Sequence, residues 1–360
     1  MKRILVVICT DFVPFGGLTT VMMNYYRNMD RDGLVIDFAS TNNAPRVLLD
    51  ELQSNGNRYY NLGQRKYILT YFFNLYRVCR NYDIIHVNGN SATTVIEHFA
   101  AYLAGIKYRI NHNHTSIPDH KKLSDFVYPL FKKLVTNRVA CSDLAGGWLY
   151  RDEKFVVLRN AIDVDKYQYN INKRKAYRLQ FNISEDCVVF GHLGKIYKPK
   201  NHPYLLKIFA EFHKRVQNSV LFLVGDGEMR EEIERQIDLL NIRDNVIFAG
   251  LRTDVAEMLQ VMDFFVFPSI WEGMPLSLLE AASSGLPCFI SDSITKDVQI
   301  GPNIQALSIK DEPVVWANYI NEHLPKESRE VICSQNAKLI SEAGFNIKTA
   351  TRVLEKIYKS

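Results

Sequence analysis

Two glutamates eight residues apart stand on either side of a turn that combines glycine with proline. The segment 268–281 reads PSIWEGMPLSLLEA, with the carboxylates at Glu272 and Glu280. The apolar run 264–267 before it predicts a buried strand, and Pro275 suits the first position of a helix. The first turn of that helix offers unpaired N–H groups and a positive dipole end to an anion. Carboxylates that accept hydrogen bonds from hydroxyls beside an anion site indicate a nucleotide sugar as the ligand.

A lysine-rich loop follows another predicted strand, residues 188–191. It carries Lys195, Lys198 and Lys200. Lysine binds phosphate as a compact point charge, so these side chains are suited to neutralising a diphosphate. The loop does not have the G-x-x-x-x-G-K-[ST] spacing of a P-loop. An ordinary solvent-exposed loop is the alternative.

Two adjacent glycines, Gly16 and Gly17, separate a predicted strand at residues 4–9 from a predicted helix at 18–29. Glycines at a helix start let backbone N–H groups approach an anion closely. The pattern is not G-x-G-x-x-G, so a dinucleotide site is not indicated. A structural turn is the alternative.

Three histidines are predicted at strand ends. His86 falls in the predicted strand 83–87, and His112 and His114 fall at the end of the predicted strand 108–112. Their spacing is not that of a helical metal site, and no carboxylate accompanies them at ligand spacing, so no metal is predicted. They are candidates for substrate or phosphate contacts, with a structural role as the alternative.

Short β-branched strands alternate with amphipathic helices along the whole chain, which predicts parallel sheets covered by helices on both faces. Two such α/β domains are expected, 1–163 and 164–345, with a C-terminal helix at 346–360 that packs back on the first. Ligands of open parallel sheets bind beyond the carboxyl ends of the strands. We therefore expect the candidate residues to line a cleft between the two domains. The predicted strands are 4–9, 34–39, 83–87, 108–112 and 138–141 in the first half and 188–191, 220–224, 246–248, 264–267 and 287–290 in the second.

The composition excludes several classes of protein. The chain has 360 residues, 47% hydrophobic and 23% charged, which is ordinary for a folded soluble protein. No apolar run reaches the ~18 residues of a membrane span. The run at 4–9 is too short for a signal peptide, and the six cysteines form no C-x-x-C pair. A cytoplasmic protein without a disulfide framework is expected.

Positive charge is concentrated in the first half. Residues 1–163 contain 20 Lys and Arg against 14 Asp and Glu, whereas 164–360 contain 24 against 25. Together with the aromatic stretch 67–76, this predicts peripheral attachment to an anionic membrane surface, at the inner face of the plasma membrane. The alternatives are a solvated basic face and an aromatic stripe that belongs to the core. The basic pairs are Lys121-Lys122 and Lys132-Lys133. No nucleic-acid partner is expected.

The segment Glu272–Glu280 resembles the E-x7-E motif of retaining GT-B glycosyltransferases, in particular family 4. The resemblance covers nearly the whole chain. It implies an α/β fold of the GT-B type, with two doubly wound Rossmann-like domains that face each other across a cleft. The other segments that resemble the family are 16–17, 83–86, 109–114, 158–163, 223–227 and 248–250.

The resemblance also implies roles for individual residues. Glu272 and His114 act at the donor sugar and the reacting centre, and Glu280 holds the ribose. Lys195 stands where the family usually has arginine, so a bidentate fork is replaced by a point charge, and Lys198 is positioned to share the role. The residues implied to bind the donor diphosphate are Gly16, Gly17, Lys195, Lys200, Gly273 and Met274. Further substrate contacts are assigned to His86, His112 and Asn160.

The expected activity is therefore transfer of a hexosyl or N-acetylhexosaminyl group, with retention, from a nucleoside-diphosphate sugar. The acceptor is expected to be a glycan or polyprenyl-linked glycan in bacterial capsule or exopolysaccharide synthesis. No cofactor is expected, because protein cations and a helix end bind the diphosphate in enzymes of this kind and the chain has no D-x-D motif. The alternatives are a GT-B-fold sugar-nucleotide epimerase and a non-catalytic protein that binds nucleotide sugars.

Overall fold

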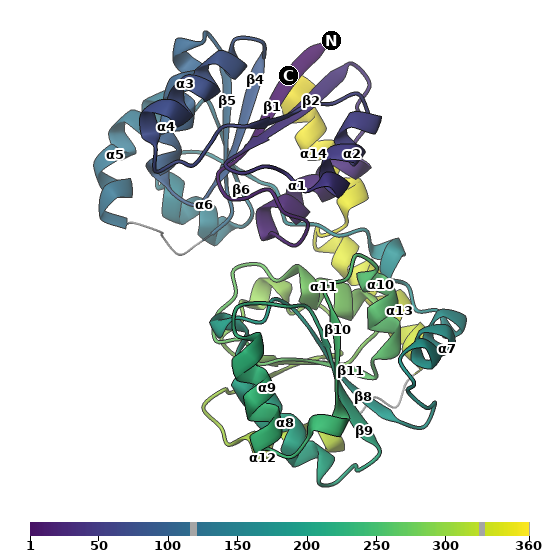
Figure 1. Ribbon diagram of the computed structural model, residues 1–360. Coiled ribbons are helices and arrows are strands. Elements are labelled where there is room, and N and C mark those ends of the chain that lie inside the picture. The colour runs from purple at the N-terminus through teal and green to yellow at the C-terminus, as the bar shows by residue number, and fades with distance from the viewer. Residues whose placement is uncertain (116–120, 324–327, 360) are drawn as a thin grey trace. The chain divides into compact units, whose positions relative to one another are not determined.

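The chain folds into two compact α/β units, each with its own parallel sheet (Figure 1). The computed structural model describes residues 1–115, 121–323 and 328–359. The N-terminal unit comprises Met1–Ala161 and Ile347–Ser360, and the C-terminal unit comprises Ile162–Asn346. The first unit thus ends at Ala161, whereas the predicted domain boundary follows residue 163. The C-terminal helix also belongs to the first unit.

The sheet of the N-terminal unit has seven parallel strands in the order β3-β2-β1-β4-β5-β6-β7. Its central strands are buried on both faces, as expected for a sheet covered by helices on both sides. Strand β1 carries apolar, β-branched residues almost without interruption, whereas β4 and β5 bury His and Asn side chains towards their carboxyl ends. The bounds are β1 Lys2–Ile8, β2 Leu34–Ser40, β3 Tyr59–Asn61, β4 Ile84–Gly89, β5 Tyr108–Asn113, β6 Asn137–Ala140 and β7 Val156–Val157.

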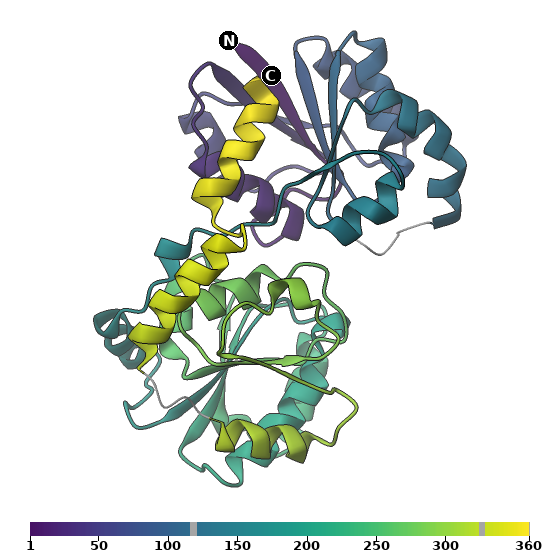
Figure 2. The same cartoon turned by 180° about the vertical axis from the view of Figure 1, so that it is seen from behind.

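Helices connect these strands, and the last helix of the chain completes the unit. Helix α14 packs on α1 and β1, and Figure 2 shows it in yellow along the sheet. Its apolar side chains repeat at helical spacing and are buried. The α-helices are α1 Gly17–Asn28, α2 Arg46–Ser54, α3 Ile68–Cys79, α4 Val95–Leu103, α5 Lys121–Leu134, α6 Asp143–Tyr150 and α14 Ile347–Lys359, with a short 3₁₀ helix η1 at Ala92–Thr94.

The C-terminal unit has a six-stranded parallel sheet in the order β10-β9-β8-β11-β12-β13. Two apolar clusters cover its two faces. Its strands are β8 Val188–Leu193, β9 Ser219–Val224, β10 Val246–Gly250, β11 Phe264–Phe267, β12 Cys288–Ser291 and β13 Ile304–Leu307. Its α-helices are α7 Ile171–Gln180, α8 His202–His213, α9 Arg230–Leu239, α10 Val255–Val261, α11 Leu276–Ser283, α12 Pro313–Glu322 and α13 Arg329–Glu342, and its 3₁₀ turns are η2 Val164–Tyr167, η3 Lys198–Lys200, η4 Arg243–Asn245 and η5 Lys296–Val298.

The predicted fold class is confirmed, and the ten predicted strands are present with shifts of a few residues at their ends. Three further strands, β3, β7 and β13, lie at the sheet edges. They are short and only partly buried, so they lack the apolar runs that identify a central strand.

One local prediction, the position of Pro275, is corrected. Pro275 caps α11 from outside, and the helix begins at Leu276. Asp254 precedes α10 but makes no side-chain capping bond, because its carboxylate accepts two hydrogen bonds from Arg252, at 2.8 and 2.5 Å.

The aromatic stretch 67–76 divides between the core and the surface. Tyr71 and Leu75 are buried, whereas Ile68, Leu69 and Phe73 are exposed. One face of α3 therefore packs in the core, as the alternative interpretation of this stretch expected. The opposite face of α3 is exposed and is also apolar. Within the part of the chain that the structure describes, no helix has the length and apolar character needed to cross a membrane.

Candidate active site

The turn between β11 and α11 holds Glu272 against Lys200. The Lys200 Nζ lies 2.7 Å from Glu272 Oε1, and both side chains are about nine-tenths buried, with 10% and 11% exposed. The two residues that the sequence assigned to diphosphate and to donor sugar therefore form one ion pair within the C-terminal unit. Any anion that approaches Lys200 therefore also meets the carboxylate of Glu272.

Two hydrogen bonds to backbone carbonyls fix this pair by tying the lysine loop to the glutamate turn. Ile270 donates its N–H to the carbonyl of Pro199 at 2.8 Å. The side-chain amide of Asn201 donates to the carbonyl of Pro268 at 3.1 Å. Asn201 has φ 57°, a left-handed conformation that asparagine tolerates better than most residues, and it ends η3 just before α8 begins. These contacts position Lys200 beneath the turn.

Lys200 also lies against an aromatic ring. Its Nζ lies 4.2 Å from the centroid of the Phe267 ring, a cation–π distance. Burial lowers the pKa of Lys200, and the facing carboxylate of Glu272 opposes that shift. The side chain is therefore a partly desolvated cation, which interacts more strongly with a ligand charge than a solvated lysine does.

Glu280 lies inside α11, where it is buried and hydrogen-bonded. Its Oε1 accepts a hydrogen bond from the Tyr167 hydroxyl at 2.8 Å. Burial raises the pKa of Glu280, which the hydrogen bond from Tyr167 partly offsets. A carboxyl group held in this way is a preformed acceptor for ligand hydroxyl groups.

The turn also presents backbone donors. In the part of the chain that the structure describes, the N–H groups of Gly273 and Met274 have no backbone carbonyl partner. They stand immediately before the first turn of α11, whose own N–H groups have no helical partner. These donors and Lys200 belong to the same turn, a suitable arrangement for an anion.

The loops after β8 and β9 approach each other at backbone distance. Gly225 has φ +134°, and a Cβ at this position would lie 2.1 Å from the carbonyl oxygen of Gly194. Gly194 in turn donates its N–H to the Val224 carbonyl at 3.0 Å. Only glycine fits at Gly225, and the close approach fixes the start of the lysine loop.

Lys195 is in a different environment from Lys200. It forms an ion pair with Glu228 at 2.9 Å, and both side chains are 59% exposed. Its Nζ also lies 5.4 Å from the Tyr197 ring centroid. The structure therefore does not bring Lys195 to the Lys200–Glu272 pair, and its role at the diphosphate stays a prediction.

In the N-terminal unit, the glycine pair lies where the sequence placed it. Gly16 is the N-cap residue of α1, and Gly17 is its first residue. A Cβ on Gly16 would meet Val13 Cγ2 at 3.1 Å, whereas a Cβ on Gly17 would meet nothing within 4 Å. Gly17 thus faces open space at a helix N-terminus.

The three histidines stack on one another, with His86 and His112 buried and His114 partly buried. The rings of His86 and His112 lie parallel with centroids 5.4 Å apart, and the rings of His112 and His114 lie 3.9 Å apart. His86 lies in the middle of β4 rather than at its end, because the strand continues to Gly89. Its Nδ1 is 2.6 Å from the Tyr358 hydroxyl on α14. In this structure His86 is therefore an internal contact between the sheet and the last helix.

Burial keeps the stacked imidazoles neutral. It lowers the pKa of His86 to about 3 and that of His114 to about 4, and the pKa of His112 falls well below its usual value. The side chain of Asn160 opposes the shift in the pKa of His114. The described residues contain no group of three or more His, Cys, Asp or Glu side chains that could hold a metal ion.

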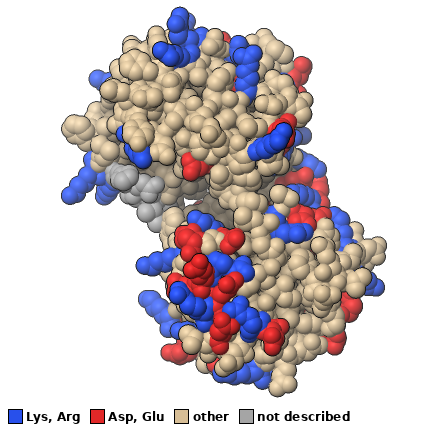
Figure 3. All heavy atoms as spheres, in the orientation of Figure 1, with Lys and Arg blue, Asp and Glu red and all other residues tan. Residues whose placement is uncertain are grey.

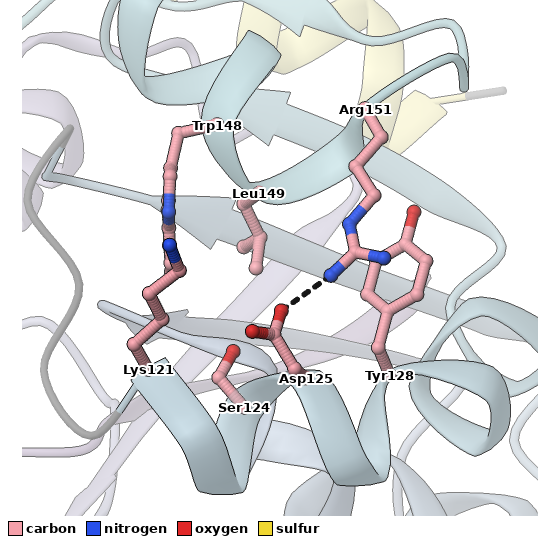
Figure 4. A pocket seen from close by; sticks show the side chains of 7 residues that line it. All are labelled: Lys121, Ser124, Asp125, Tyr128, Trp148, Leu149 and Arg151. Carbon is pink, nitrogen blue, oxygen red and sulfur yellow. Dashed lines mark hydrogen bonds and ion pairs between the residues drawn. The ribbon is translucent and has the colours of Figure 1, made fainter.

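A separate hollow of about 190 Å³ lies between α5 and α6 of the N-terminal unit (Figure 4). An ion pair between Arg151 and Asp125, at 2.5 Å, crosses it, and the Arg151 guanidinium lies 4.0 Å from the Tyr128 ring centroid. None of the predicted site residues lines it.

Three residues that contact predicted site residues within their own unit were missed by the sequence analysis, namely Tyr167, Asn88 and Tyr358. Tyr167 meets a partner 113 positions away, and Tyr358 meets one 272 positions away. Asn88 accepts a hydrogen bond from His114 Nε2 at 3.0 Å. No local motif marks such residues, because their partners come from other elements of the fold.

Comparison with known proteins identifies the family. The family profile for glycosyl transferases group 1 matches residues 173–340. EpsF of Bacillus subtilis, a protein named as a glycosyltransferase, is 32% identical to this chain over 352 residues. The match spans 92% of this chain and 91% of EpsF. This chain belongs to the group 1 glycosyltransferases.

One further relative agrees with this assignment, and a solved structure agrees with the fold. The UDP-Gal:alpha-D-GlcNAc-diphosphoundecaprenol alpha-1,3-galactosyltransferase of Escherichia coli is 28% identical over 306 residues, 79% of this glycosyltransferase and 77% of that enzyme. The structure of Anabaena Alr3699/HepE in complex with UDP and glucose superposes with a TM-score of 0.79 at 17% identity, covering 99% of both chains. The predicted GT-B fold and family are confirmed.

Proposed function

We propose that this glycosyltransferase transfers a sugar, with retention, from a nucleoside-diphosphate sugar to a glycan or lipid-linked glycan during exopolysaccharide or capsule synthesis. The observation that carries the proposal is the buried Lys200–Glu272 pair at the start of α11, with buried Glu280 on the same helix. The relatives support a UDP-sugar as donor, because the galactosyltransferase is named for UDP-Gal and HepE holds UDP.

The donor's diphosphate would be held by Lys200, by the N–H groups of Gly273 and Met274, and by the N-terminus of α11. These groups favour the charge that accumulates on the diphosphate as its bond to the sugar breaks. Glu272 would accept hydrogen bonds from sugar hydroxyls, and Glu280 from the ribose. Gly17 and Lys195 are proposed as further contacts to the diphosphate.

Retention would follow from a front-face reaction. The bond between the sugar's anomeric carbon and the diphosphate oxygen breaks, and the acceptor hydroxyl forms its new bond on the same face. The hydroxyl proton passes to the departing diphosphate, so the reaction uses no second carboxylate as nucleophile. His114 is proposed to contact the sugar at this step. The proposal includes no metal, because the cationic groups come from the chain itself.

We also propose that the N-terminal unit attaches to an anionic membrane at the cytoplasmic face, where a polyprenyl-linked acceptor would lie. Helix α5 exposes Phe126 and Leu123 together with its lysine pairs. The neighbouring helices α3 and α4 add exposed apolar side chains, and Figure 3 shows few charges over this face. An apolar face with basic residues is the pattern of a helix that lies in a membrane interface. The exposed apolar residues of α3 and α4 are Ile68, Leu69, Phe73, Phe99, Tyr102 and Leu103.

A thermal-shift screen of nucleotides and nucleotide sugars tests the donor site. A ligand that binds only the folded state raises the melting temperature. At a hundred times its Kd, it adds about 2.7 kcal/mol to the free energy of unfolding. UDP and at least one UDP-sugar are expected to raise it, and the Glu280→Gln variant is expected to respond less. If no nucleotide or nucleotide sugar shifts the wild-type transition, the donor assignment is wrong.

A further inference from the structure

We propose that Asn88 is the positioning residue that sets the tautomer of His114, with the proton on Nε2 and a bare Nδ1 that accepts a hydrogen bond from a sugar hydroxyl. The tautomer follows from the N-terminal unit alone. The identity of the hydroxyl group rests on the proposed function.

The orientation of the Asn88 amide is fixed by two backbone carbonyls. Its Nδ2 lies 3.4 Å from the Val7 oxygen and 3.3 Å from the His86 oxygen. A carbonyl oxygen only accepts, so the amide nitrogen must face this side. The reverse orientation would place three oxygens together in a buried site, because Asn88 is fully buried. The Asn88 oxygen therefore points towards His114.

That oxygen determines where the His114 proton sits. Asn88 Oδ1 is 3.0 Å from His114 Nε2, and it also only accepts, so Nε2 must carry hydrogen. Burial lowers the pKa of His114 to about 4, so near pH 7 the ring is neutral and carries one proton. Nδ1 is consequently an unprotonated acceptor.

The other tautomer has a specific cost. A proton on Nδ1 would have no hydrogen-bond partner among the described residues. It would also leave a bare Nε2 facing the Asn88 oxygen at 3.0 Å. Two buried acceptors at that distance repel each other and both lose their hydrogen bond.

The ring has little freedom to escape this arrangement. His112 stacks against His114, His86 stacks against His112, and the Tyr358 hydroxyl holds His86. Asn88 stands on β4 beside His112 of β5, in register in the sheet. The imidazole is therefore presented in one orientation by two adjacent strands.

The bare nitrogen is the part of His114 left for a ligand. Nδ1 of His114 is buried and has no hydrogen-bond partner among the described residues, and the same holds for Oδ1 of Asn160. A buried acceptor without a partner costs about 1–3 kcal/mol, which a ligand donor would recover. Two acceptors call for hydroxyl groups, the donors in which a sugar is rich.

Long-range ¹H–¹⁵N spectra of the full-length protein labelled with ¹⁵N-histidine test the tautomer directly. They distinguish a protonated ring nitrogen from a bare one, and the His114→Gln spectrum identifies the His114 signals. We expect hydrogen on Nε2 and a bare Nδ1 in the wild-type protein at pH 7. Hydrogen on Nδ1, or on both nitrogens, would overturn the proposal without the need for any variant.

Two variants test whether Asn88 is the cause. Asn88→Leu removes the acceptor, so a population with hydrogen on Nδ1 should appear. Asn88→Asp keeps an acceptor and should retain hydrogen on Nε2 at pH 8. His98 is the internal control, because Asn111 accepts from its Nε2 at 3.1 Å, and its signals should not change. An unchanged His114 tautomer in folded Asn88→Leu would show that Asn88 is not its cause.

Activity tests the ligand half of the proposal. In Asn88→Leu, kcat/KM for transfer should fall about threefold to tenfold, the equivalent of one neutral hydrogen bond. In Asn88→Asp the carboxylate raises the pKa of His114, so the acid limb of the activity profile should move to higher pH. Normal kcat/KM in folded Asn88→Leu would overturn the proposed hydrogen bond between a sugar hydroxyl and His114 Nδ1. It would leave the proposed transferase function standing. Absence of transfer by the wild type would overturn the proposed transferase function and leave the tautomer assignment standing.

Discussion

Glu272 is the partner of Lys200 as well as a candidate sugar contact, so its two roles can be separated by measurement. We predict that Glu272→Gln lowers transfer at least about a hundredfold, in the range found for groups that stabilise charge in the transition state. We also predict a loss of about 1.5–3 kcal/mol in the free energy of unfolding, because the hydrogen bond of the buried Lys200 loses its charged acceptor. Enzyme assays and chemical denaturation measure the two effects.

The matched control is Glu228→Gln. This substitution breaks the exposed ion pair with Lys195. Because a surface ion pair contributes about 0–1 kcal/mol, the free energy of unfolding should change by no more than that. Equal stability losses in the two variants would contradict the distinction between the two lysines. Near-normal turnover in Glu272→Gln would remove Glu272 from the site.

Glu280 should stabilise the fold less as pH rises, because burial raises its pKa in the folded state. Below the unfolded value, about 4.3, the carboxyl group is protonated in both states and contributes no pH dependence. As pH rises through the higher folded value, the unfolded state loses its proton first, so wild-type stability falls. Glu280→Gln should therefore be more stable than wild type at pH 7, yet bind the donor more weakly. Melting temperatures at pH 4 and pH 7 check this. A Gln variant that is less stable at pH 7 would contradict it.

The proposed diphosphate contacts also predict metal independence. Lys200 is a desolvated cation, and the amides of Gly273 and Met274 supply uncharged donors. Transfer should continue in excess EDTA at more than half of its untreated rate. Loss of activity that added magnesium restores would show that a metal performs the role assigned to these groups.

At the scale of the element, helix α5 combines two features that the sequence analysis considered separately. Its lysine pairs were noticed, but the exposed Phe126 and Leu123 were not, because a helix surface is known only once the packing is known. Lys132 pairs with Glu153 at 2.5 Å, so its charge is partly neutralised. Attachment should therefore depend on the apolar side chains as well as on the lysines.

We predict that binding to anionic liposomes falls when Phe126 is replaced by Ser, and falls again when the four lysines of α5 are also replaced by Ser. Each basic residue near an anionic surface contributes about 1 kcal/mol, and salt should weaken the binding. Co-sedimentation measures it. Leu239→Ser on α9 is the matched control, since Leu239 is 80% exposed and Phe126 82%. Equal recovery with neutral and anionic liposomes would contradict the electrostatic part.

The turn before α11 shows how far sequence reasoning reaches at this scale. The strand, the glycine, the proline and the two glutamates are local, so their order alone predicts a strand, a turn and a helix. The pairing of Lys200 with Glu272 was not predicted, because it depends on contacts between loops that follow different strands. The acceptor Glu280 was predicted, but Tyr167, which orients it, was not.

At the scale of the molecule, the chain crosses from one unit to the other and returns. The N-terminal unit is completed by α14, in which Leu354 and Tyr358 are fully buried. The sequence predicted this helix and its return, since its apolar residues repeat at helical spacing. It did not predict that Tyr358 contacts His86.

Replacing Leu354 by Ala should lower the stability of the N-terminal unit by about 2–5 kcal/mol, the range for large-to-small changes in a core. Differential scanning calorimetry should show the loss in one transition, while the transition that UDP stabilises stays unchanged. Val353→Ala on the exposed face of the same helix is the control. Equal effects of the two substitutions would show that α14 is not part of this core.

The most direct test of the account is to follow a labelled sugar from its nucleotide in the presence and absence of a lipid-linked glycan acceptor. We predict that the label moves to the acceptor with the anomeric configuration of the donor, that transfer requires the acceptor, and that Glu272→Gln lowers it at least about a hundredfold. A label that stays on the nucleotide as an epimer, or a donor that binds without being consumed, would contradict the assignment of this protein as a sugar-transferring enzyme.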